Sequence, residues 1–304
     1  MNLPSQTAAT IHEFANDHRS GSAELALRAC GILGKFAPDK ARSPEALSFC
    51  KHLAQALAAA QPSMAAVLNV CNRWLAAAER GEPPKRAAPR IASELQQAHQ
   101  AVAHWAAGLI LPGATVMTYS YSSTVLAALL ASWQKGCRFR VLCAEGRPQM
   151  EGRALAERLA MKGIPVELFT DAAFFSALGT GDLVLVGCDA IQSHWLVNKV
   201  GTAALLSLAR RARIPSFVVA DSFKFLPRKL EKWFQIRPQA AGEVWRARHK
   251  NVTVHNLYFE KVPLRDGARI VTEEGIWPPG AIRGLLQKVE VAAGFRQVPD
   301  QHER

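Results

Sequence analysis

The chain has 304 residues, which is enough for two domains and a large buried core. Hydrophobic residues make up 49% and charged residues 20% of the chain, proportions of a globular protein that exclude intrinsic disorder as the starting interpretation. The net charge is +12, yet the basic residues are dispersed along the chain, so we do not expect nucleic-acid binding to be its main role.

The N-terminal third is predicted to be helical. Ala, Leu and Val recur there at three- and four-residue spacing, and nothing alternates with the period of two that marks a strand. The prolines around Lys85, Arg86 and Arg90 predict a solvated linker at that point. The predicted helices cover residues 5–16, 21–36, 44–60, 63–80 and 91–109. We therefore expect a helical N-terminal domain over residues 1–109.

After Pro112 and Gly113, short apolar strands alternate with helices. The predicted strands cover residues 115–118, 139–143, 165–169, 183–186, 216–220 and 269–272. The predicted helices cover residues 123–134, 150–162, 172–178 and 201–213, and one more follows Pro279. This alternation predicts an α/β fold, in which a Rossmann-like parallel-sheet domain over residues 110–304 follows the helical domain. Residues 226–262 break the pattern and form either a lid or interface arm, or an ordered connection packed on the domain.

Neither a cofactor nor a metal is expected. The six cysteines are scattered without a C-x-x-C pair, and no histidine lies at zinc-ligand spacing from them, so we expect reduced structural thiols. No apolar run reaches the roughly 20 residues that a membrane helix needs. Residues 1–15 lack an apolar stretch behind a basic start, so we expect a cytoplasmic protein without a membrane partner.

Polar residues follow the predicted strands, at the sheet edge where ligands bind in such folds. They are residues 120–124, 145–148, Asp171, 187–189, Asn198, Lys199, Asp221 and Lys224. Residues 119–124 open a helix, and free N–H groups at a helix start bind phosphate. Ser122 or Ser123 could instead serve only as the helix cap.

Three further positions also allow two interpretations. Arg147 either donates from its planar guanidinium group to phosphate oxygens or forms an ion pair with Glu145 or Glu151. Asp189 ends an apolar strand and is either a functional base or a helix cap. Lys199 and Lys224 either supply cations to the site or are solvated surface charges.

Six ordered motifs resemble one protein family. They are T-Y-S-Y-S-S-T at 118–124, A-E-G-R-P-Q-M-E-G-R at 144–153, V-G-C-D-A-I at 186–191, V-N-K-V-G-T at 197–202, A-D-S-F-K-F at 220–225 and I-V-T-E-E-G-I-W-P-P at 270–279. Their order and spacing are similar to those of the α, β and δ regulatory subunits of eukaryotic initiation factor 2B. That family includes the archaeal ribose-1,5-bisphosphate isomerases and the methylthioribose-1-phosphate isomerases. The resemblance covers residues 110–290 and extends to residues 19–23.

The resemblance implies a homodimer built through the C-terminal domain and a sugar-phosphate pocket between the two domains. It implies that phosphate and hydroxyls are held by Arg19, Ser22, Ser120, Ser122, Ser123, Arg147, Asn198, Lys199 and Lys224. In the isomerase members, a Cys after the first strand and an Asp in a G-A-D motif move the protons. Asp189 occupies the Asp position here, and Ser120 occupies the Cys position.

This sequence departs from the isomerase pattern in ways that bear on function. The Ser120 hydroxyl has a pKa far above neutrality and cannot by itself give or take a proton there, and the regulatory subunits also lack the Cys. Gly146 stands where the family usually has Ser or Thr, and residues 194–196 replace the usual Asn-Gly. Cys188 neighbours Asp189 and is a candidate substitute acid, although it lies on the alternate side of the strand.

Three hypotheses follow. The first is a non-catalytic protein that binds a phosphorylated sugar or a nucleotide. The second is an aldose–ketose isomerase of a sugar phosphate, in which Asp189 is the base. The third is an interaction subunit related to translation initiation, which acts through its dimer and its basic surface on a protein partner.

Overall fold

The computed structural model describes residues 3–17, 20–41, 43–246, 249–264 and 268–296. They belong to two compact units, each described here by itself. The helical unit draws on Met1–Gln97, Phe223–Gln235 and Arg283–Arg304, and the sheet unit draws on Ala98–Ser222 and Ile236–Ile282.

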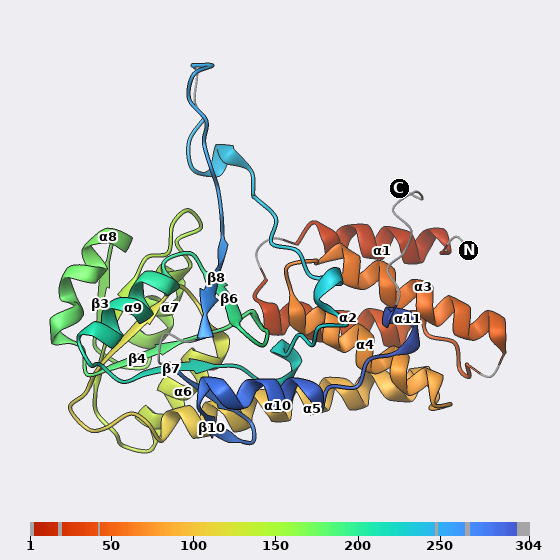
Figure 1. Cartoon of the computed structure of the whole chain (residues 1–304), viewed down its shortest axis with the longest axis horizontal. Helices are drawn as coiled ribbons and strands as arrows, with labels where there is room; N and C mark the ends of the chain where they lie inside the picture. The colour runs from red at the N-terminus through yellow and green to blue at the C-terminus, as the bar shows by residue number, and fades with distance from the viewer. Residues whose placement is uncertain (1–2, 18–19, 42, 247–248, 265–267, 297–304) are drawn as a thin grey trace. The chain divides into compact units, whose positions relative to one another are not determined.

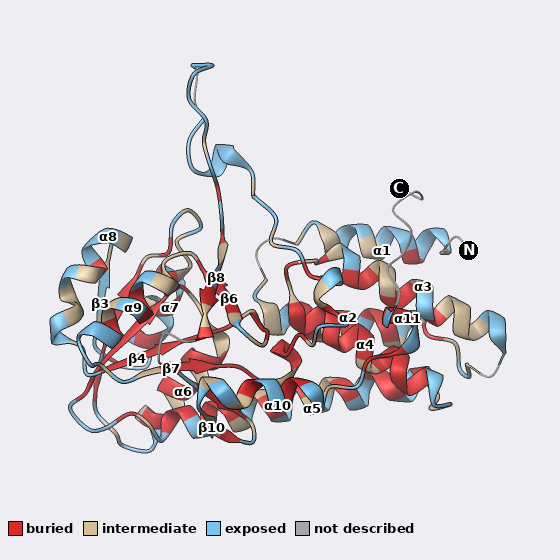
Figure 2. Cartoon of the chain, in the orientation of Figure 1, coloured by how far each residue is buried: buried red, intermediate tan, exposed pale blue. Residues whose placement is uncertain are grey.

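The first four predicted helices of the N-terminal region are confirmed. They are α1 (Ser5–Ala15), α2 (Ser22–Phe36), α3 (Pro44–Ala60) and α4 (Ala65–Glu79), and the short α11 (Ala293–Arg296) joins the same unit. Helix α4 is the centre of this unit, because nearly all of its residues are buried, including Trp74. Figure 2 shows this concentration of buried residues. In the part of the chain that the structure describes, no helix is both long enough and apolar enough to cross a membrane.

The predicted linker is wrong, because residues 84–90 are the first turns of α5 (Pro84–Ala107). Pro84 is tolerated there, since the first N–H groups of a helix have no intrahelical partner. Pro89 lies inside the helix and cannot donate to the preceding turn. Ala87, Ala88 and Ile91 are almost fully buried, so packing of this face outweighs the local preference of the prolines.

The sheet unit is built on a seven-stranded sheet (Figure 1). The alternating pattern predicted six of these strands and their parallel arrangement, and it missed the seventh, which covers Gly275–Trp277. The strand order is β10-β9-β7-β4-β1-β2-β3, and all neighbouring pairs are parallel except β10 with β9. The strands are β1 (Thr115–Tyr119), β2 (Arg140–Ala144), β3 (Val166–Phe169), β4 (Leu183–Val186), β7 (Ser216–Val219), β9 (Arg269–Thr272) and β10 (Gly275–Trp277). The helices are α6 (Ser123–Gln134), α7 (Glu151–Ala160), α8 (Asp171–Phe174), α9 (Thr202–Arg211) and α10 (Ile282–Gln287), of which α10 spans the boundary between the units.

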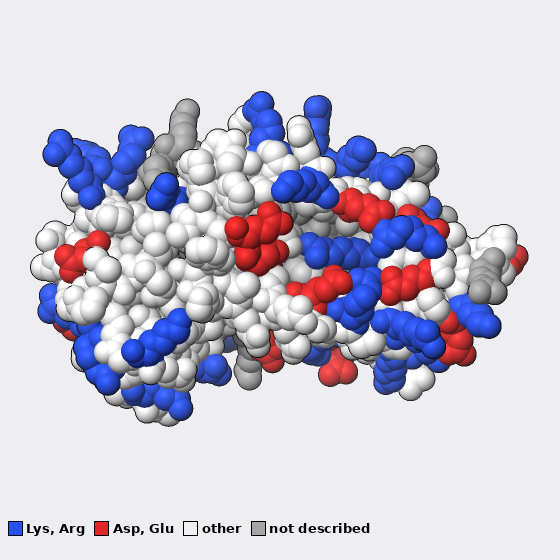
Figure 3. Space-filling view, turned by 90° about the horizontal axis from the view of Figure 1, so that it is seen from below, with Lys and Arg blue, Asp and Glu red and all other residues white. Residues whose placement is uncertain are grey.

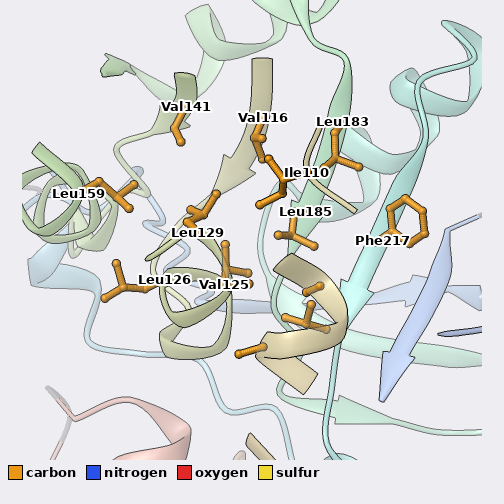
Figure 4. Packing of buried hydrophobic residues seen from close by; sticks show 14 of the residues in the cluster. Ile110, Val116, Val125, Leu126, Leu129, Val141, Leu159, Leu183, Leu185 and Phe217 are labelled. Carbon is orange, nitrogen blue, oxygen red and sulfur yellow. The ribbon is translucent and has the colours of Figure 1, made fainter. Parts of the chain in front are cut away.

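One apolar cluster holds this sheet against its helices. Alternate residues of the central strands, such as Val116, Val141 and Leu185, meet Leu129 of α6 and Leu159 of α7 (Figure 4). Each large side chain that is buried in this way contributes about 1.5–3 kcal/mol. The cluster therefore holds β1, β2 and β4 against α6 and α7.

A second, antiparallel sheet has the order β5-β6-β8, with β5 (Ala190–Ile191), β6 (Trp195–Lys199) and β8 (Phe259–Pro263). The sequence pattern did not predict these strands. β5 has two residues, and β6 pairs with a strand about 60 positions later, so no local signal joins them. This sheet places Asn198 and Lys199 next to the ends of the main sheet, as their contacts show below.

The segment for which two interpretations were open divides into two parts. Leu226 and Leu230 are fully buried, and Gln235 N donates to Pro62 O at 2.8 Å, so the first part is an ordered connection packed on the helical unit. The described residues 237–246 and 249–257, which we call the arm, project as a largely exposed excursion before β8 (Figures 1 and 2). The arm exposes four large apolar side chains, those of Val244, Trp245, Val252 and Leu257.

Candidate functional site

Ser120 lies directly after β1 in an unusual backbone conformation. Its φ is +64°, in the left-handed region that non-glycine residues rarely adopt, and its side chain is buried. The preceding Tyr119 is also buried, and burial, followed by the nearby Asp171 carboxylate, raises its pKa above the ordinary value. The end of β1 is therefore tightly held.

Ser122 connects this turn to helix α6. Its hydroxyl accepts a hydrogen bond from Val125 N at 3.3 Å, so the predicted helix cap is confirmed, and Ser123 is the first residue of the helix. Gly187, just after β4, lies so close that an added Cβ would be 2.7 Å from both Cβ and Oγ of Ser122. The same Cβ would be 3.9 Å from Oδ1 of Asn198, whose Nδ2 donates to Thr202 Oγ1 at 3.0 Å. Ser122, Gly187 and Asn198 thus come together from three separate strand ends.

The turn after β2 is held by Asp171. This carboxylate, which was predicted at the same sheet edge, accepts hydrogen bonds from Gly146 N at 2.9 Å and Arg147 N at 2.8 Å. The side chain of Arg147 is exposed, and the two carboxylates considered as its partners bind other cations. Glu145 pairs with Arg153 at 2.8 Å, and Glu151 pairs with Lys199.

Lys199 is buried, so the interpretation of this residue as a solvated surface charge is wrong. Its Nζ donates to Oε1 and Oε2 of Glu151 at 2.9 and 3.2 Å and lies 5.0 Å from the centre of the Tyr258 ring. The Tyr258 hydroxyl contacts Gln149 and Glu243, and burial, followed by the Glu243 contact, raises its pKa to about 12.

This network was not predicted as a unit. Glu151 was considered only as a partner of Arg147, and Tyr258 lies in the segment without a pattern. The signal that points to Glu151 is its place inside the A-E-G-R-P-Q-M-E-G-R motif, but the 48-residue separation from Lys199 hides the pairing.

Asp189 lies between β4 and β5 and is partly buried. Its N–H donates to Val197 O at 2.8 Å. No described helix follows it, since β5 begins at the next residue, so the helix-cap interpretation is wrong. The thiol of Cys188 is directed to backbone carbonyls, with Ala190 O at 3.1 Å and Val197 O at 3.6 Å.

The remaining predicted site residues belong to the helical unit. Lys224 is buried between the buried side chains of Phe223 and Phe225, and its Nζ donates to Ser22 Oγ. Asn69 Nδ2 fixes this turn by donating to Phe223 O at 2.8 Å and Phe225 O at 2.7 Å. The solvated interpretation of Lys224 is therefore wrong as well. Arg19 lies outside the described residues.

The described residues contain no metal cluster, and the helical unit shows no single basic patch on the face drawn in Figure 3. Among the described residues, no group of three or more His, Cys, Asp or Glu side chains could hold a metal ion. All six cysteines are free, and burial raises the pKa of Cys30 and Cys143 to about 12. On the face drawn in Figure 3, basic and acidic side chains alternate over the helical unit, as in the pairs of Arg90 with Glu82 and Glu94.

Comparison with known proteins gives one group of relatives. Residues 18–279 match the family described as the initiation factor 2 subunit family. A ribose 1,5-bisphosphate isomerase from Archaeoglobus fulgidus is 30% identical over 271 residues, which are 85% of this chain and 85% of that protein. A protein from Pyrococcus horikoshii named translation initiation factor eIF-2B subunit 2-like is 28% identical over 91% of this chain and 98% of its own length. The solved structure of a Pyrococcus horikoshii translation initiation factor eIF-2B matches with a TM-score of 0.79 at 26% identity, covering 95% of this chain and 100% of that one.

Proposed function

Because the chain belongs to the initiation factor 2 subunit family, as its six motifs predicted, we propose that it binds a phosphorylated sugar or a nucleotide without catalysis. The observation that supports binding is the convergence of Ser122, Gly187 and Asn198 at the strand ends. The start of α6 supplies free N–H groups and a partial positive charge at this edge, and ligands of open α/β sheets bind there.

The side chain at position 120 supports the non-catalytic part of the proposal. An aldose–ketose isomerisation moves one proton between neighbouring carbons and another between their oxygens, so it needs groups that titrate near neutral pH. Ser120 supplies a hydroxyl, which does not. The Cys188 thiol, the nearest substitute considered, points to two backbone carbonyls.

The test is thermal unfolding of the purified protein with a panel of sugar phosphates and nucleoside monophosphates. A ligand at 100 times its dissociation constant stabilises the folded state by about 2.7 kcal/mol. We expect a shift with at least one compound and no conversion of that compound. Measurable turnover would overturn the non-catalytic part, and a panel without any shift would overturn binding of this ligand class.

An isomerase is the second candidate, because the Archaeoglobus fulgidus relative carries that name and Asp189 lies at the same sheet edge as Ser122 and Asn198. Asp189 would act as the base. If turnover is found, Asp189→Asn is expected to abolish it while binding persists. Turnover that survives this substitution would refute the role of Asp189.

The name of the Pyrococcus horikoshii relative supports a third candidate, a subunit related to translation initiation. Such a subunit co-purifies with a GTPase or with ribosomal components at low salt, and a pull-down free of either would count against it. The homodimer stays a prediction from the resemblance, and the mass of the purified protein in solution tests it.

A further inference from the structure

A hydrogen-bond chain of three side chains connects the arm to the turn after β2. Gln149 Nε2 donates to the Tyr258 hydroxyl, and this hydroxyl donates to Glu243 Oε2 at 2.5 Å. Gln149 belongs to the turn, Tyr258 lies directly before β8, and Glu243 belongs to the arm. Each hydrogen bond in such a series polarises the next, so the three side chains hold one another more firmly than separate pairs would.

The arm end of the hydrogen-bond chain is fixed at the base of the arm. Asn256 Nδ2 donates to Glu243 Oε2 and to Ala240 O, each at 2.8 Å, and Gln239 N donates to Asn256 O at 2.9 Å. Asn256 is 3% exposed, so its hydrogen bonds lie away from water, where they are stronger. Glu243 therefore keeps its place while the base of the arm is closed.

The turn end of the hydrogen-bond chain lies beside a strained residue. Met150, which follows Gln149, has a φ of +58°, a left-handed conformation that a non-glycine residue keeps only where its surroundings hold it. Asp171 holds the other end of the turn through Gly146 N and Arg147 N. Gln149 thus ties the strained end of the turn to Tyr258.

From these contacts we infer that Glu243 is a positioning residue, which acts through Tyr258 and Gln149 on the turn after β2. Arg147, the predicted phosphate contact, lies in this turn, so its position depends on whether the base of the arm is closed. The two residues that follow Glu243 expose large apolar side chains, so motion of the exposed part of the arm reaches the turn. The inference goes beyond the proposed function, because the coupling of arm and turn does not depend on which ligand binds.

The test is amide hydrogen exchange at single-residue resolution, measured on the element that was not altered. Glu243→Ala cuts the hydrogen-bond chain in the arm and is expected to speed exchange of the hydrogen-bonded Met150 and Gly152 amides about fivefold, the effect of losing one hydrogen bond. Gln149→Ala cuts it in the turn and is expected to speed exchange of the Gln239 amide by a similar factor, because coupling is reciprocal. Both altered residues are exposed, so both variants are expected to fold.

Further variants separate the hydrogen-bond chain from local effects. Tyr258→Phe removes the shared hydroxyl and is expected to speed exchange in both elements. Glu243→Gln keeps an acceptor for that hydroxyl, so its effect is expected to be smaller than that of Glu243→Ala. At the turn, Gln149→Ala combined with Glu243→Ala is expected to match Gln149→Ala alone, since the hydrogen-bond chain is already cut. The matched control is Glu167→Ala, which removes a carboxylate from an exposed pair with Arg140 and is expected to leave both elements unchanged.

Unchanged exchange on the unaltered element, in either Glu243→Ala or Gln149→Ala, would overturn the inference, because each side chain would then stabilise only its own surroundings. An equal rise at the Gly163 amide, which lies beyond the other end of α7, would overturn it as well, since the whole unit would have loosened. Effects that multiply in the double variant would refute a shared hydrogen-bond chain. None of these measurements needs a ligand, so their failure would leave the proposed function standing.

Discussion

Gly201 lies where two independent requirements for glycine meet, and Gly201→Ala violates both at once. Its φ is +107°, and an added Cβ would be 2.6 Å from both Cζ and Oη of the buried Tyr119 ring. A left-handed conformation costs a non-glycine residue about 1–2 kcal/mol. Forcing an extra carbon against a packed ring costs about 1–3 kcal/mol. We expect Gly201→Ala to lower the free energy of unfolding by about 2–5 kcal/mol.

Two other glycines provide matched controls. Gly163 has a φ of +78° with no atom within 4 Å of an added Cβ, so Gly163→Ala carries only the backbone cost. At Gly187 the close contact is with Ser122 and no positive φ is involved, so Gly187→Ala carries only the steric cost. Urea unfolding followed by far-ultraviolet circular dichroism gives all three values. If Gly201→Ala is no more destabilising than Gly163→Ala, the close approach of Tyr119 to Gly201 is refuted.

Two further predictions concern single side chains. Asn69→Ala leaves the buried carbonyls of Phe223 and Phe225 without the Asn69 Nδ2 donor, and is expected to lower the free energy of unfolding in urea by about 2 kcal/mol or more. The control Asn16→Ala changes an exposed side chain and is expected to change stability little. Equal effects of the two substitutions would refute the anchoring role of Asn69. Tyr258 has its pKa raised to about 12, so its contribution to stability is fully present below its ordinary pKa near 10 and is lost as the pH rises through 12. Stability of Tyr258→Phe is therefore expected to fall less steeply between pH 10 and 12, and parallel pH curves for the two proteins would contradict this cause.

Most of the fold could be predicted from local patterns. Fully apolar runs such as Leu183–Val186 mark buried parallel strands, and the helix over Ser123–Gln134 has the expected bounds. The prediction was wrong around Pro84 and Pro89. It gave the two prolines more weight than the apolar spacing of Ala87, Ala88 and Ile91, whereas in the structure the packing of these three residues keeps the segment helical.

The candidate site was predictable only as a set of positions. That Ser122 and Asn198 lie at one edge follows from the rule that parallel strands end together. The close approach of Ser122 and Asn198 to each other depends on Gly187, which lies beside both and has no side chain, and no sequence pattern marks this glycine. The pairing of Lys199 with Glu151 depends on β6, which is fixed by β8 from a distant part of the chain, so it has no local signature.

The closed base of the arm makes it a place where the chain can be lengthened or cut. Gln239 N donates to Asn256 O at 2.9 Å, and Asn256 Nδ2 donates to Ala240 O at 2.8 Å, so residues near the two ends of the arm are hydrogen-bonded to each other before β8 begins. The register of β8 with β6, which positions Asn198 and Lys199, is set after this closure. A fluorescent protein inserted among the exposed residues, or new termini created there by circular permutation, would leave that register intact.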